Sequence, residues 1–148
     1  MIGVNHYLAG VGIAVLGKNP LLAVPVAFAS HFVLDVLPHF GLNKDVPNRG
    51  KILGRVGYAD AVLVLVAAVL TAMNYPLWYI LIGLVAMSPD FAWIYRFVVQ
   101  EKFGTLPPRP HVNWFNAWHA GIQKLEFAGG IVIDAATICL LSWLLFLR

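Results

Sequence analysis

Apolar runs divided by short polar breaks constrain the fold of this chain more than any other feature. The runs cover residues 4–16, 21–37, 58–73, 77–99 and 127–147. A helix needs roughly 20 apolar residues to cross a bilayer, so the later runs approach that length and the first is too short. Charged residues make up only 11% of the chain, whereas soluble proteins use roughly 25%. We therefore predict one integral membrane domain over residues 1–148.

The breaks between the runs predict helices rather than strands. Residues 17–20 (Gly-Lys-Asn-Pro) and 74–76 (Asn-Tyr-Pro) have turn sequences, and residues 41–54 are predicted to form a polar loop. Residues 104–110 contain three prolines, which exclude a helix there. Ser88-Pro89-Asp90 predicts an interruption of the fourth helix.

Residues 111–126 differ from the other segments because they are amphipathic. Phe115, Trp118, Ile122 and Leu125 follow a 3-4-3 spacing, which is typical of one face of a helix. Tryptophans in such a segment suit the membrane–water interface. The expected fold class is all-α: a polytopic membrane bundle of about four spanning or re-entrant helices, with a short N-terminal helix and an interfacial amphipathic helix.

The distribution of basic residues predicts the orientation in the membrane. They concentrate around the 41–54 loop and after the fourth helix: Lys44, Arg49, Lys51, Arg55, Arg96, Lys102, Arg109 and Lys124. The positive-inside rule therefore places both longer loops in the cytoplasm. The basic residues do not alternate with aromatics, so we expect membrane lipid as a partner and no nucleic acid. Homo-oligomerisation stays open.

The segment SHFVLDVLPHF, residues 30–40, sets His31, Asp35 and His39 four residues apart. Each step of four residues drifts by only about 40° around a helix, so the three side chains share one stripe. Imidazole and carboxylate groups on one stripe are typical ligands of a divalent metal ion such as zinc. Pro38 is expected to end the helix and to turn His39 away from the stripe. The alternative is a His–Asp pair that only locks helix packing.

The predicted topology brings further polar side chains to the same cytoplasmic half. His6, Asp90 and His119 are candidate additional metal ligands, and Asp60 and Asp90 are candidate catalytic carboxylates that accept a proton. Each has a simpler alternative: solvation for His6, interfacial packing for His119, polar packing for Asp90, and a helix N-terminal charge for Asp60. Weaker candidates are His111, Glu126 and Asp134.

These motifs together resemble the YdjM/DUF457-type family of inner-membrane proteins, which are described as metal-dependent hydrolases. The H-x-x-x-D element of His31 and Asp35 and the Pro-Asp element at Asp90 are also similar to motifs of zinc-dependent phospholipase C and P1 nuclease. The resemblance implies a prokaryotic inner-membrane location and zinc ligation by these residues and His39. Related sequences often have an acidic residue two places after the Pro-His pair, where this chain has Gly41, a departure that bears on a second metal ion.

The expected function is metal-assisted hydrolysis of an amphiphilic ester or phosphoester at the cytoplasmic membrane face. One or two zinc-like ions would activate water and polarise the scissile group. Two other classes stay open. The first is a non-enzymatic membrane protein that binds metal or acts as a scaffold, and the second is a small transporter or channel subunit that uses the carboxylates for ion passage.

Overall fold

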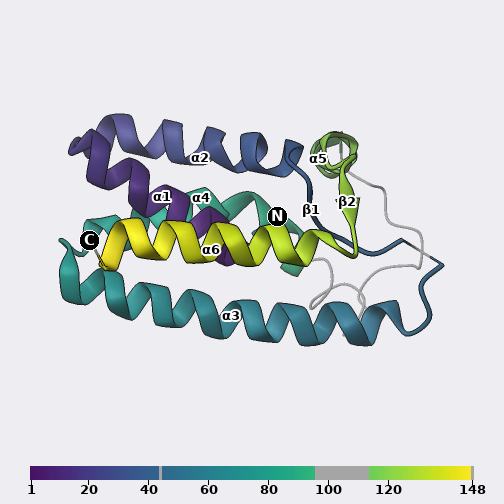
Figure 1. Ribbon diagram of the computed structural model, residues 1–148. Helices are drawn as coiled ribbons and strands as arrows, with labels where there is room; N and C mark the ends of the chain where they lie inside the picture. Colours follow the sequence, from purple (N-terminus) through teal and green to yellow (C-terminus); the bar gives the residue numbers. More distant parts are fainter. Residues whose placement is uncertain (44, 96–113, 148) are drawn as a thin grey trace.

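The computed structural model describes residues 1–43, 45–95 and 114–147, which fold into helices joined by short connections (Figure 1). The elements in chain order are α1 (Gly3–Gly17), α2 (Pro20–Val36), β1 (His39–Phe40), α3 (Arg49–Asn74), α4 (Trp78–Tyr95), α5 (Trp114–Ile122), β2 (Glu126–Phe127) and α6 (Gly130–Phe146). The all-α prediction is confirmed. The predicted break at 104–110, the end of the 77–99 run, His111 and the basic residues Lys44, Arg96, Lys102 and Arg109 lie outside the described residues.

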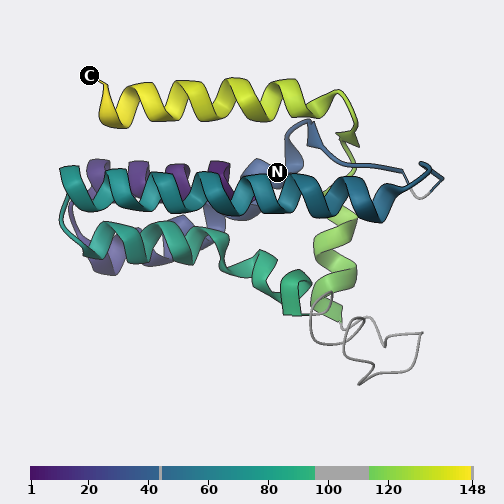
Figure 2. The same cartoon turned by 90° about the horizontal axis from the view of Figure 1, so that it is seen from below.

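Helix α1 lies at the centre of the bundle and contacts α2, α3, α4 and α6. The long helices run alongside one another, whereas α5 lies across their ends and is seen along its axis in Figure 1. Figure 2 shows the same arrangement from below. The strands β1 and β2 form a parallel pair, with His39 opposite Glu126 and Phe40 opposite Phe127. This pair joins the chain after α2 to the chain before α6.

The core forms where α1 meets α4. Val4, Tyr7, Leu8 and Val11 on α1 are almost fully buried. Gly10 lets the two backbones approach closely, because a Cβ atom at this position would lie 2.7 Å from the carbonyl oxygen of Ile82. Small residues at a helix contact allow this approach and gain van der Waals contact over the whole length of the pair.

The ends of α2 follow from its sequence. Asn19 caps the helix by accepting a hydrogen bond from the backbone N–H of Leu21 at 3.0 Å, and Pro20 occupies the first turn, where its missing N–H costs nothing. The helix ends at Val36, and Leu37 is extended, as Pro38 requires of its preceding residue. The prediction that the helix ends before His39 is confirmed.

Helix α4 continues through Ser88-Pro89-Asp90, so the predicted interruption is wrong. Pro89 has no N–H to donate to the carbonyl oxygen of Val85 one turn earlier. The Ser88 hydroxyl donates to that oxygen at 2.8 Å instead, which is a known way to tolerate proline in an apolar helix. The ribbon of α4 bends in its last third (Figure 2).

Helix α3 begins at Arg49, nine residues before the apolar run that was expected to define it. The backbone N–H groups of Lys51 and Ile52 bond to the carbonyl oxygen of Asn48 at 2.9 and 3.1 Å. Adding a residue to an existing helix costs much less than starting one. The helix therefore extends into the glycine-containing basic segment that was predicted to be loop.

One described helix, α3, is long and apolar enough to cross a membrane. Helices α1, α2 and α6 and the Trp78–Ala92 part of α4 are apolar but shorter, within the ranges that the structure covers. At 1.5 Å per residue, the 17 residues of α2 or α6 span about 26 Å, against about 30 Å of hydrocarbon. Of the expected four or so spanning or re-entrant helices, one among the described residues, α3, is a clear candidate to span.

The close approach of α1 and α4 gives a stability prediction with an internal control. Gly10→Ala is expected to lower the free energy of unfolding by about 1–3 kcal/mol, because the new methyl group meets the α4 backbone. Gly12→Ala in the same helix meets nothing within 4 Å and is expected to be neutral or to stabilise by about 0.5–1 kcal/mol. Unfolding of both purified variants in detergent checks this, and equal effects would contradict the packing argument.

Candidate metal centre

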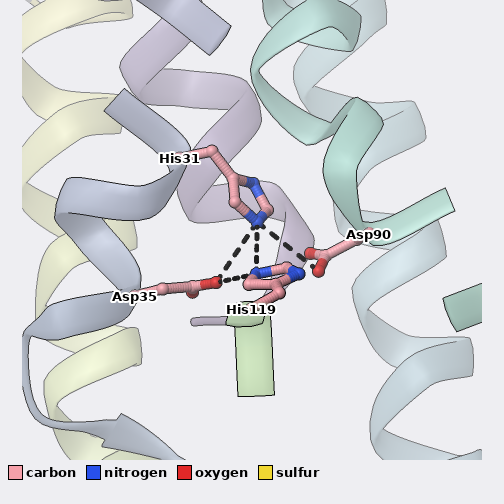
Figure 3. Close-up of side chains that lie close together, drawn as sticks. All are labelled: His31, Asp35, Asp90 and His119. Carbon is pink, nitrogen blue, oxygen red and sulfur yellow. Dashed lines mark hydrogen bonds and ion pairs between the residues drawn. The ribbon is translucent and has the colours of Figure 1, made fainter. Parts of the chain in front are cut away.

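Four side chains from three helices converge at one end of the bundle. His31 and Asp35 come from α2, Asp90 from α4 and His119 from α5, and one ligand atom of each lies within 4.8 Å of all the others. Figure 3 shows the four side chains pointing toward one another. His31, Asp35 and His119 are fully buried, whereas the Asp90 side chain is 25% exposed. The cluster is therefore open to its surroundings only on the Asp90 side of these four residues.

The distances within the cluster suit a small divalent ion. The Nε2 atom of His31 lies 3.1 Å from Nε2 of His119, 3.2 Å from Oδ2 of Asp35 and 3.6 Å from Oδ1 of Asp90. Tetrahedral coordination at 2.0–2.2 Å separates neighbouring ligand atoms by roughly 3.3–3.6 Å. The contact between His119 and Asp35 is shorter, at 2.7 Å. A His/Asp cluster of this size could hold a metal ion.

The helix α2 positions its two ligands as the sequence predicts, one turn apart on one face. The Nδ1 atom of His31 lies 2.9 Å from the carbonyl oxygen of Ala86 on α4. A carbonyl oxygen only accepts, so Nδ1 carries the proton of this hydrogen bond. In the neutral ring this bond leaves the lone pair on Nε2, directed into the cluster. Metal-binding histidines are commonly oriented by such a backbone bond.

His6 lies beside the cluster and is also fully buried. Its ring stacks on His31 with centroids 3.9 Å apart, and its Nε2 atom lies 3.2 Å from Oδ1 of Asp35. Its Nδ1 atom makes no hydrogen bond to any residue that the structure describes. A buried polar atom without a hydrogen bond is costly, so His6 fits a centre in which a cation or a ligand completes its bonding.

Asp35 collects more contacts than sequence reasoning anticipated. Its Oδ2 atom accepts a hydrogen bond from Nε2 of Gln123 at 2.9 Å, and its Oδ1 atom contacts the α-amino group of Met1. Gln123 was not a predicted site residue. The signal was its position four residues after His119, a spacing that places side chains on the same side of a helix, although α5 itself ends at Ile122.

Asp60 is a residue of α3 that lies outside the four-residue cluster and contacts the first residues of α1. Its two carboxylate oxygens accept hydrogen bonds from the backbone N–H groups of Gly3 and Val4 at 2.9 and 2.8 Å. A carboxylate at a helix N-terminus satisfies orphan donors and is favoured by the helix dipole. The helix-end alternative for Asp60 is thus realised, although the helix concerned is α1 and not its own α3.

Asp134 has a comparable structural role. It is fully buried, and its Oδ2 atom accepts from the backbone N–H of Phe40 at 2.9 Å. Its Oδ1 atom accepts from the side chain of Asn5 at 2.8 Å. The carboxylate therefore joins α6 to both β1 and α1 close to the cluster. It holds the connection that follows α2 in place.

His39 lies in β1, outside the four-residue cluster, and faces Glu126 of β2. Its Nδ1 atom donates to the carbonyl oxygen of Leu37 at 2.7 Å, and its Nε2 atom lies 3.4 Å from Oε1 of Glu126. A Cβ atom at Gly41 would lie 2.5 Å from Cβ of Glu126. Glu126 therefore occupies the space that a side chain at position 41 would need.

The Glu126 contact alters the protonation of His39. Burial disfavours the charged ring, but the facing carboxylate of Glu126, the hydrogen bond to Leu37 and the charge of Asp35 together outweigh burial and raise the pKa of His39 above its usual value of 6.5. A raised folded-state pKa stabilises the fold fully below pH 6.5, and this contribution disappears as the pH rises through the folded pKa. The pair therefore joins β1 to β2 more strongly in mild acid.

The ion pair between His39 and Glu126 predicts a pH-dependent mutational effect. Glu126→Gln is expected to lower the free energy of unfolding by about 0.5 kcal/mol near pH 6 and by much less near pH 9, since Glu126 is partly exposed and its ion pair is screened. Thermal unfolding at both pH values measures the difference. Asp45→Asn, which removes an exposed loop charge, is the control, and the same pH dependence in both variants would contradict the pairing.

The geometry stands without support from relatives. No protein-family model, curated protein or solved structure matches this chain. The resemblance of its motifs to YdjM/DUF457-type proteins therefore stays a prediction, and any functional conclusion rests on the residues themselves.

Proposed function

We propose that this chain is a membrane-embedded, metal-dependent hydrolase that acts on an amphiphilic ester or phosphoester. The observation that carries the proposal is the convergence of His31, Asp35, Asp90 and His119 at distances that suit one divalent ion. Zinc is an ion that suits imidazole and carboxylate donors of this kind. His6 adds a fifth donor at the edge of this set.

The membrane setting is supported by an inverted distribution of polarity. Buried polar side chains gather inside the bundle, and they include Asn5, His6, His31, Asp35, Thr71, His119 and Asp134. Large apolar side chains cover the outside of α3, such as Leu65, Val69 and Met73, and only 11% of its most apolar stretch is buried. In water this arrangement would oppose the hydrophobic effect. In a bilayer it leaves apolar groups in lipid and polar groups paired inside.

The orientation is supported by the basic end of α3. Arg49, Lys51 and Arg55 lie in its first two turns, at the end of the bundle where α5 lies (Figure 1). The positive-inside rule places this end in the cytoplasm of a prokaryotic cell. The centre then faces the cytoplasmic leaflet, where amphiphilic substrates present their ester or phosphate groups.

The residues of this chain divide the chemical tasks. A bound divalent cation supplies a Lewis acid that polarises an ester or phosphoryl oxygen and lowers the pKa of water. His31, Asp35 and His119 hold the centre from two helices, and the carbonyl of Ala86 keeps His31 in the required tautomer. Asp90, the most exposed of the four, has the longest contact to His31 and is best placed to accept a proton from the attacking water.

The burial of the cluster favours a second candidate, a metal-binding protein without turnover. Three of the four side chains are fully buried, and closed centres are typical of structural zinc sites, whereas catalytic sites keep an open position. Asp90 distinguishes the two candidates, because only its side chain provides a partly open edge.

Metal content tests the centre directly. Wild-type protein purified without chelator is expected to hold about one divalent ion per chain, since one donor atom of each of the four side chains lies within 4.8 Å of the others. His31→Ala is expected to lose it, and His39→Gln is expected to retain it because His39 faces Glu126 outside the cluster. Elemental analysis with a folding check by circular dichroism measures this. Metal-free wild type, or equal loss in both variants, would reject the assignment.

Turnover separates the hydrolase from the metal-binding candidate. The metal-loaded protein is expected to cleave a chromogenic phosphodiester or a short-chain lipid ester, and Asp90→Asn is expected to lower kcat about 100-fold or more. Asp60→Asn should keep most of kcat and lower the unfolding temperature, because Asp60 caps α1. Stoichiometric metal without turnover on either substrate class would favour the second candidate. A loss of kcat in Asp60→Asn at unchanged stability would restore its predicted catalytic role.

A further inference from the structure

Helix α5 carries an apolar face that points away from the protein. Trp114, Ala117, Trp118 and Gly121 are all exposed, and Trp114 reaches 80%. Their spacing of three, one and three residues places them on one stripe. A surface helix in water normally exposes its polar side, so this face is built for a different surrounding.

Two polar side chains point inward, His119 from α5 and Gln123 from the residue directly after the end of α5. His119 and Gln123 both contact Oδ2 of Asp35, at 2.7 and 2.9 Å. Apart from these bonds, α5 rests on α2 through aromatic contacts, in which Phe32 lies 4.9 Å from Trp118 and 6.3 Å from Phe115 between ring centroids. The position of one metal ligand thus depends on how a short transverse helix is seated.

The depth of the cluster in the bundle, compared with the basic end of α3, indicates what surrounds α5. Asp60 binds the first N–H groups of α1, and the α-amino group of Met1, just before α1, contacts Asp35, so Asp60 and the cluster lie at similar depth. Arg55 is five residues before Asp60, or about 7.5 Å further out along the helix. Interfacial helices bury their apolar face about 5–10 Å below the headgroups. The separation of about 7.5 Å between Arg55 and the level of the cluster lies within this range.

We infer that the exposed stripe of α5 inserts into the near leaflet of the lipid bilayer, and that this insertion seats His119 and Gln123 on Asp35 and completes the metal centre. The inference rests on the proposed function and adds its regulation: the affinity for the ion depends on the lipid surface. Two events that favour the same seated conformation strengthen each other by linkage. The occupant of the stripe is lipid because the stripe is uncharged, aromatic, and level with the basic end of α3.

Insertion of α5 is measured separately from metal binding. Ala117→Cys in a Cys139→Ser background carries an environment-sensitive dye on the exposed stripe, and Asp45→Cys carries the same dye on the loop before α3. In vesicles of phosphatidylcholine with phosphatidylglycerol, the dye at 117 is expected to shift to an apolar spectrum and the dye at 45 to report water. A water-like spectrum at 117, or an apolar one caused by a second copy of the chain as shown by cross-linking, would overturn the inference.

Metal affinity measures the coupling. In the same vesicles, Trp114→Gln and the double variant Trp114→Gln/Trp118→Gln are expected to bind Co²⁺ about fivefold or more weakly than wild type, a usual size for coupling between sites. Trp143→Gln, which removes an exposed tryptophan of α6, is the control. The single Trp114→Gln variant isolates the effect of lipid contact, because Trp118 also packs on Phe32.

The outcomes distinguish the two levels of the proposal. Wild type that binds no metal while the dye at 117 reports lipid would reject the metal centre and with it the coupling. Wild type that binds metal with equal affinity in all the tryptophan variants would leave the centre standing and overturn only its dependence on the membrane.

Discussion

The buried carboxylate of Asp35 is the constraint around which the helix ends are arranged. A carboxylate in an apolar segment is unfavourable by roughly 2.5–3.5 kcal/mol on insertion scales unless it is paired. Each neighbouring segment therefore contributes a partner, and these partners are the α-amino group of Met1, His6, His31, His119 and Gln123. Because the donors and imidazoles come from α1, α2 and α5 or from residues just outside α1 and α5, contacts to one side chain relate the positions of all three helices.

In the rest of the fold, buried polar groups fix the positions of neighbouring elements by hydrogen bonds, and exposed apolar groups contact the surroundings. Asp60 and Asp134 each hold backbone N–H groups of a neighbouring element, and Ser88 satisfies the carbonyl that Pro89 leaves open. The interior therefore combines buried, paired polar groups with the apolar core where α1 meets α4. Such an interior positions metal ligands accurately, because every buried polar group that lacks a partner costs free energy.

Sequence patterns predicted some features of the centre and missed others. The spacing of His31 and Asp35 predicted their shared helix face, and Pro38 predicted the end of α2 before His39. Asp90 and His119 were inferred from charge topology and do lie beside them. The pairing of His39 with Glu126 and the role of Gln123 depend on contacts between segments far apart in the chain. No local periodicity encodes such contacts.

Local sequence accounts for the helical class, the apolar runs and the ligand pair on α2, because these follow from periodicity and from proline and glycine placed within a few residues. Only tertiary contacts determine which carboxylates belong to the candidate metal centre and which stabilise the fold. Asp60 and Asp90 look alike in sequence, yet one caps α1 and the other faces His31. The physical reason is that a carboxylate's role is set by the donors within about 3–4 Å, and those donors arrive from other helices.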